Sequence, residues 1–158
     1  MSLNKSRTSA IYGICVAGAI IISGVVLFLL MNFGIGYDST PDGGLGQGLA
    51  VALGVIFAIL LMIALAAIAI VALIEGVLLL IAIGNKRNLR WFALVTAILK
   101  FLVFPIAMVL SFLSFWLSIW LVGAVGFLLA VAVLISAIFD LLAFSEMKNY
   151  FIWLAQMR

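Results

Sequence analysis

Two charged residues, Glu75 and Lys100, lie deep inside long apolar runs, where charged side chains are rare. They stand at similar distances on either side of one short basic segment, residues 84–90. At a helical rise of about 1.5 Å per residue, both would lie on the order of 15 Å inside a bilayer. Opposite charges at equal depth on adjacent antiparallel helices predict a buried ion pair. Charges inside a membrane are also the first candidates for a functional site.

Asp140 is the third member of this candidate site, about five residues before the end of the last apolar run. The long side chain of Lys100 can extend toward it, so we predict a buried charge cluster of Glu75, Lys100 and Asp140. Such a cluster can fix the register of the helices, or Glu75 can serve as a protonatable or ion-coupled group in a transport path. We favour the first interpretation, because one lysine at close range suits a fixed contact better than a proton carrier.

The residues that most enzyme chemistry needs are missing from the sequence. It contains no histidine, a single cysteine, no glycine loop ahead of a lysine and no G-x-S-x-G motif. Residues 38–43 resemble the start of a calcium-binding loop, but Leu49 stands at the twelfth position, where such a loop needs glutamate. We therefore expect no enzymatic activity, no cofactor and no metal site.

The composition is that of a membrane protein. Hydrophobic residues make up 69% of the 158 residues and charged residues only 8%, too few to cover a soluble surface. The apolar runs exceed 18 residues and do not alternate with polar residues, which predicts membrane-spanning helices and excludes a membrane barrel. We predict one all-α integral membrane domain over residues 1–158. The net charge of +3 is spread over loops, so we expect no nucleic-acid partner.

Four spans are predicted, at about residues 10–31, 50–84, 91–111 and 118–144, with an external loop at 32–49 and a cytoplasmic turn at 85–90. The first span resembles a signal peptide but is longer than a signal peptide's apolar core and lacks a clear cleavage site, so we expect it to be retained. The second would be about 54 Å long if unbroken, which predicts a long, tilted helix. No glycine, asparagine or aspartate marks the reversal between the last two spans; we place it within 111–118, beside an aromatic belt.

The tail, residues 145–158, has apolar residues at helical spacing among polar ones. It forms either an amphipathic helix on the membrane surface or an extension of the fourth helix. Lysine and arginine occur in the N-terminal segment, the 85–90 turn and this tail, whereas the 32–49 loop has aspartates only. The distribution predicts cytoplasmic N and C termini in a multi-pass protein of the cell membrane.

Small residues recur at four-residue spacing, which is typical of helices that pack closely in membranes, either within one bundle or against a partner. They are Ser9, Gly13, Ala17, Ala50, Gly54, Ala58, Gly126 and Ala130. We therefore predict a small membrane subunit or interaction protein that packs in the lipid bilayer against another membrane protein or a second copy. The alternative is a small transporter or channel component in which Glu75, Lys100 and Asp140 line an ion or proton path.

Overall fold

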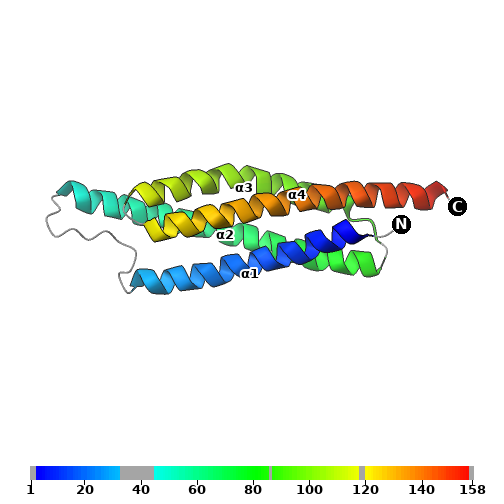
Figure 1. Cartoon of the computed structure of the whole chain (residues 1–158), viewed down its shortest axis with the longest axis horizontal. Helices are drawn as coiled ribbons and strands as arrows, with labels where there is room; N and C mark the ends of the chain where they lie inside the picture. The colour runs from blue at the N-terminus through cyan, green and yellow to red at the C-terminus, as the bar shows by residue number, and fades with distance from the viewer. Residues whose placement is uncertain (1–2, 33–44, 86, 118–119, 157–158) are drawn as a thin grey trace.

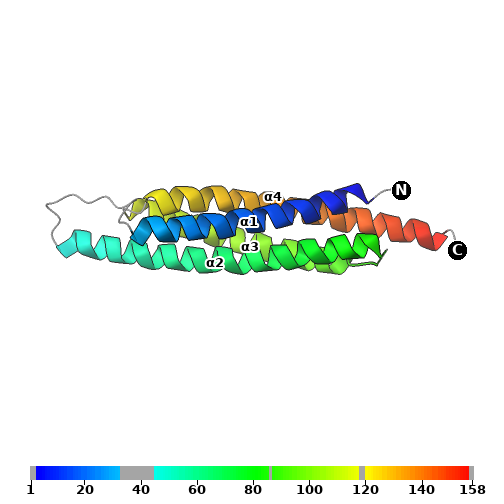
Figure 2. The same cartoon turned by 90° about the horizontal axis from the view of Figure 1, so that it is seen from below.

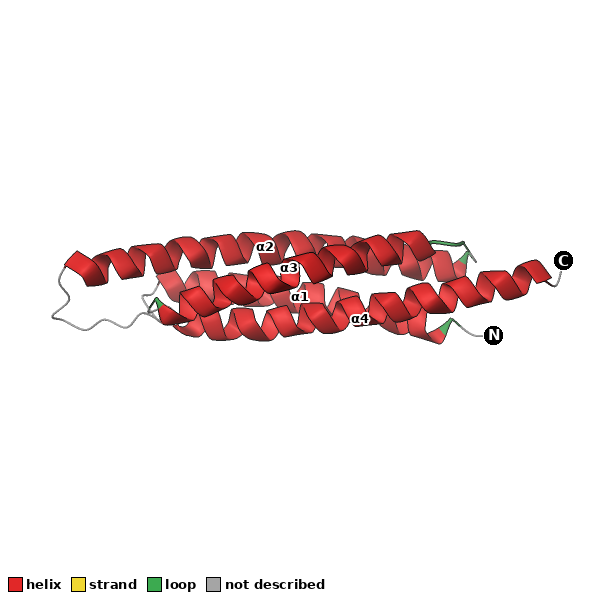
Figure 3. Cartoon of the chain, turned by 90° about the horizontal axis from the view of Figure 1, so that it is seen from above, coloured by secondary structure: helices red, strands yellow, loops and turns green. Residues whose placement is uncertain are grey.

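The computed structural model of the chain is a bundle of four long helices (Figure 1). The structure describes residues 3–32, 45–85, 87–117 and 120–156, and nearly all of them are helical (Figure 3). Each helix is long and apolar enough to cross a membrane, which confirms the four-helix prediction and identifies a multi-pass membrane protein. The helices are α1 (Asn4–Asn32), α2 (Leu45–Gly84), α3 (Arg90–Trp116) and α4 (Trp120–Gln156).

The helices pack side by side in chain order. α1 contacts α2, α2 contacts α3, α3 contacts α4 and α4 returns to α1, with a smaller contact between α2 and α4. The start of α1 and the end of α4 lie at the same end of the bundle as the turn between α2 and α3 (Figures 1 and 2). We call this end, which carries Lys5, Arg7, Arg90 and Lys148, the basic end, and the opposite one the far end.

α2 is a single helix of 40 residues, about 60 Å long, and it begins earlier than the predicted span at 50–84. Its first turns extend past the other helices at the far end (Figure 1). The helix is unbroken at Gly76. This glycine gives α1 room to approach, because a Cβ there would lie 2.7 Å from the carbonyl oxygen of Ala10. Most of the predicted 32–49 loop, including the calcium-like residues 38–43, lies outside the described residues.

The boundary between α3 and α4 lies later than predicted. α3 continues to Trp116 and α4 begins at Trp120, whereas the predicted spans ended at 111 and began at 118. Ser111 does not interrupt α3, because its hydroxyl donates a hydrogen bond of 2.6 Å to the carbonyl of Ala107 in the same helix. Around this turn the aromatic side chains of Phe112, Trp116 and Trp120 are exposed, as expected at a membrane interface.

The tail does not form a separate surface helix. α4 continues without a break to Gln156, so residues 145–156 extend the fourth helix, which is the second of the two alternatives. α1 likewise begins at Asn4, earlier than the predicted start at residue 10. Both extensions lie at the basic end, where the polar residues of one helix find partners on the other, as the hydrogen bonds described below show.

Close packing of α3 on α4 depends on Gly123. A Cβ at this position would lie 2.6 Å from the backbone nitrogen and 2.7 Å from the Cα of Phe115. Backbone atoms cannot move away as a flexible side chain can, so any larger residue separates the two helices near their turn.

We expect Gly123→Ala to destabilise the bundle by about 1–3 kcal/mol, the usual cost of overpacking. Gly18→Ala is the matched control, because a Cβ on Gly18 meets nothing within 4 Å. Unfolding of the purified protein in detergent, followed by tryptophan fluorescence, measures both. Equal stability of the two variants would contradict the close α3–α4 contact.

Candidate functional site: a buried polar layer

Six polar side chains meet in one layer across the bundle, and every helix contributes. Each of them is at most 2% exposed. The layer consists of Ser9 from α1, Glu75 from α2, Thr96 and Lys100 from α3, and Ser136 and Asp140 from α4. The structure thus brings together the three charged residues singled out in the sequence and adds three hydroxyl groups to them.

Lys100 is the centre of the polar layer. Its Nζ donates to Glu75 Oε2 at 2.6 Å, to Asp140 Oδ2 at 2.5 Å and to Ser136 Oγ at 3.0 Å. An ammonium group has three N–H donors, so all of them are used. The expected contact between Glu75 and Lys100 is present, and Asp140 forms a second ion pair with the same lysine.

The remaining oxygen of each carboxyl group faces a hydroxyl. Thr96 Oγ1 lies 2.6 Å from Glu75 Oε1, and Ser9 Oγ donates to Asp140 Oδ1 at 2.7 Å. The sequence predicted Ser9 as a helix-packing residue only, and it did not identify Thr96 or Ser136 as hydrogen-bond partners of the charged residues. The available signal was spacing, since each of these two hydroxyls stands four residues before a charged residue and hence on the same helix face.

The Lys100 side chain leans toward the basic end. Lys100 and Thr96 bind the same carboxyl group, so the lysine side chain runs back along α3 toward its start. Helical side chains lean toward the helix N-terminus, which accounts for this direction.

A second polar contact joins α1 to α4 between the layer and the basic end. The carboxyl group of Glu146 accepts from the backbone N–H groups of Lys5 at 3.0 Å and Ser6 at 2.7 Å, and from the Ser6 hydroxyl at 2.8 Å. The first N–H groups of a helix have no partner within it, so a carboxylate from another helix satisfies them here. Ser6 itself is buried, and its hydroxyl also lies 3.5 Å from the carbonyl oxygen of Ala143.

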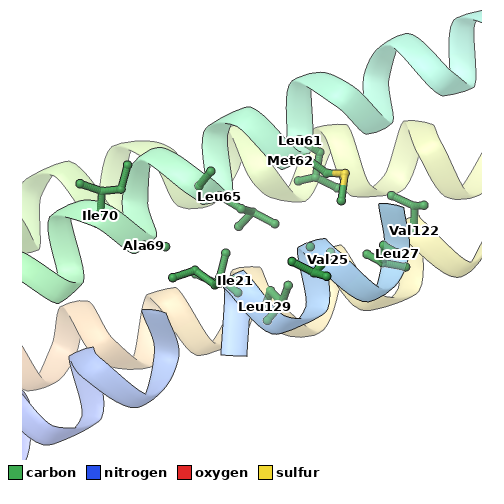
Figure 4. Close-up of a pocket in the computed structure, with 14 residues that line it drawn as sticks. Ile21, Val25, Leu27, Leu61, Met62, Leu65, Ala69, Ile70, Val122 and Leu129 are labelled. Atoms are coloured by element: carbon green, nitrogen blue, oxygen red, sulfur yellow. The ribbon is translucent and has the colours of Figure 1, made fainter. Parts of the chain in front are cut away.

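On the other side of the polar layer, the interior is mainly apolar, and the buried polar side chains described there are Ser111 and Ser114 of α3. The core toward the far end is formed by aliphatic side chains, among them Val16, Ile20, Leu65, Ile68, Leu129 and Val133. A cavity of about 370 Å³ lies in this half between α1, α2 and α4, lined by residues such as Val25, Leu61, Met62 and Leu129 (Figure 4). The described polar contacts therefore connect the layer with the basic end only.

The small residues predicted to mediate packing face the interior of this chain's own bundle. Gly13 would place a Cβ 3.4 Å from the carbonyl oxygen of Ala72, and Gly126 would place one 2.5 Å from Leu61. Ala17, Ala58 and Ala130 are fully buried, Gly54 is buried and Ala50 is half-buried. Of the two uses left open for these faces, packing within the bundle is the one the structure shows.

No protein-family model matches the sequence, and neither curated proteins nor solved structures gave a significant match. The chemistry of the site therefore rests on its own geometry. The lysine and the carboxyl groups are directed at one another and at hydroxyls of the same bundle, an arrangement suited to holding helices together.

Glu146→Ala removes the acceptor for the first N–H groups of α1. We expect a loss of about 1 kcal/mol, as for other helix N-terminal partners, and faster hydrogen exchange at the amides of Lys5 and Ser6. Asn149→Ala, an exposed position on the same helix, is the control. Unchanged exchange at both amides would show that the Glu146 contact does not hold the start of α1.

Proposed function

We propose that the chain is a non-enzymatic membrane subunit: a rigid four-helix unit that binds another helical membrane protein. The polar layer is its register-fixing cluster and not a catalytic or transport centre. The observation that carries this proposal is the complete mutual pairing of the lysine and carboxyl groups in a layer excluded from solvent. The cell membrane is its location, with the basic end on the cytoplasmic side.

We place the binding site for the partner at the projecting start of α2. α2 is about 60 Å long, twice the hydrocarbon thickness of about 30 Å, and its first turns extend past the ends of the other described helices (Figure 1). Leu49 is exposed there. Apolar helix turns that extend beyond the bilayer are unfavourable in water, which favours cover by a second helix.

A transporter or channel component is the competing function. It requires a polar path on both sides of the charged residues, as in known ion pathways through membranes. Support for it is weaker, because the described core between the layer and the far end is mainly aliphatic and its buried polar side chains, Ser111 and Ser114, carry no charge.

Removal of Lys100 tests the register-fixing role. Lys100→Met leaves the carboxyl groups without their cation, and we expect a loss of about 3–5 kcal/mol, the cost of breaking a buried ion pair. Replacing Glu75 and Asp140 by leucine in the same chain removes all three charges and should restore most of the stability. Denaturant titration in detergent compares the wild type, single and triple variants.

Two results would overturn this role. One is normal stability of Lys100→Met. The other is a substrate or ion flux in liposomes containing the pure wild-type protein that Glu75→Gln abolishes without loss of folding, which would instead support a transporter.

The partner site is tested at Leu49. We expect the protein, extracted in mild detergent, to elute in a complex larger than its own 17.0 kDa, and Leu49→Gln to release the single chain. Ile63→Gln is the matched control, because Leu49 and Ile63 are 64% and 61% exposed but Ile63 lies in the part of α2 whose neighbours Leu61 and Leu65 are buried in the bundle. A wild-type protein that elutes as one chain, or equal effects of both variants, would contradict a partner at this end.

A further inference from the structure

The polar layer contains an odd number of charged groups. Lys100 of α3 is its single cation, while Glu75 of α2 and Asp140 of α4 are two carboxyl groups. α1 contributes Ser9 to the layer, and no ionisable side chain among its described residues pairs with these three. If all three were ionised, the layer would carry an uncompensated negative charge where solvent is excluded, which is strongly unfavourable.

We infer that the polar layer is a proton-binding site, holding one proton on Glu75 that is exchanged with the basic end. With Lys100 positive, Asp140 negative and Glu75 protonated, the layer is neutral. Binding transfers a proton from a hydronium ion at the basic end to a carboxyl oxygen: one O–H bond forms on Glu75, one O–H bond of the hydronium ion breaks, and water is left behind. This inference concerns the charge of the layer and holds whether or not a partner binds at α2.

The hydrogen bonds distinguish the two carboxyl groups. Thr96 Oγ1 lies 2.6 Å from Glu75 Oε1, and it also lies 3.0 Å from the carbonyl of Ala93 and 3.1 Å from that of Phe92. Its hydroxyl can therefore donate to one of these carbonyls and accept a hydrogen bond from a protonated Glu75. No polar atom of the layer then lacks a partner.

Asp140 is placed to remain a carboxylate. One of its oxygens accepts from Ser9 Oγ and the other from Lys100 Nζ, so both are engaged by donors. For the Ser9 hydroxyl the structure shows one hydrogen bond, the one to Asp140. The Thr96 hydroxyl, by contrast, also lies beside backbone carbonyls that can accept from it. The two carboxyl groups thus have different roles, the proton residing on the α2 side and the negative charge on the α4 side.

The route for this proton is the seam between α1 and α4. Half-buried Glu146 binds Ser6, and Ser9, one helical turn further along the same face of α1, binds Asp140. Asp140 and Glu75 share the ammonium of Lys100. Hydroxyl and carboxyl groups thus lead from the basic end to the layer, and the apolar core beyond it ends the route.

Infrared spectroscopy of the protein in lipid vesicles at neutral pH tests the site. We expect the carbonyl stretching band of a protonated carboxylic acid, which shifts when glutamate carries ¹³C in its side-chain carboxyl group but not when aspartate does. Glu75→Gln should abolish the band while keeping the bundle folded, because its amide can still pair with Thr96 and Lys100. Absence of the band in the wild type, or a band that shifts with labelled aspartate, overturns the inference.

Exchange from H₂O into D₂O tests the route, because deuteration shifts the same band. We expect Ser6→Ala to slow this shift several-fold. Ser111→Ala is the matched control: Ser111 is equally buried, but its hydroxyl donates within α3, away from the seam. Equal rates in the wild type and Ser6→Ala, or slowing by Ser111→Ala alone, would exclude the α1–α4 seam as the entry path. Failure of this test is distinct from failure of the register-fixing role, which is measured by stability.

Discussion

The three donors of a single ammonium group constrain this bundle more than any other interaction. Lys100 lies on an apolar helix where water cannot satisfy it, so its N–H groups must all find acceptors on the protein. Two acceptors are on α4 and one is on α2, which sets the relative height of α2, α3 and α4 to within the length of a hydrogen bond. The Ser9–Asp140 hydrogen bond extends the same constraint to α1. A shift of any helix by one residue would leave a buried charged or polar group unpaired.

Apolar packing alone specifies register weakly inside a membrane, because one aliphatic contact replaces another at little cost. The far half of the bundle illustrates this point. Its core is formed by interchangeable aliphatic side chains, and it accommodates a cavity between α1, α2 and α4 (Figure 4). Close approach of Gly123 to the backbone of Phe115, and of Gly126 to the side chains of Leu61 and Ser111, adds some precision there. Hydrogen bonds at one level and glycine contacts at another are therefore complementary: the first set the height of the helices and the second their separation.

Fold class and the central ion pair were predictable from sequence because they follow from strong, local signals: apolar runs too long for soluble helices, and two charges placed symmetrically about one turn. The ends of the helices were not predictable in this way. Nothing in residues 111–116 stops a helix in apolar surroundings, so α3 continues to Trp116. The tail continues α4 because Glu146 finds its partners at the start of α1, more than a hundred residues away in the chain. Such long-range partners have no local pattern, which is also why Ser9 was interpreted as a packing residue alone.

The second carboxyl group of the predicted cluster decides the electrostatics of the site. A pair of one lysine and one glutamate has no net charge when both are ionised, which predicts a fixed contact with no proton to exchange. A second carboxyl group at 2.5 Å from the same ammonium removes that balance. Since the bundle supplies one cation for two acids, neutrality requires a proton on one carboxyl group. Thr96 can accept a hydrogen bond from the protonated Glu75 while it donates to a backbone carbonyl. Register fixing and proton binding are thus two consequences of one arrangement: the contacts that hold the helices at a common height are complete only when the layer contains one lysine, one carboxylate and one neutral acid.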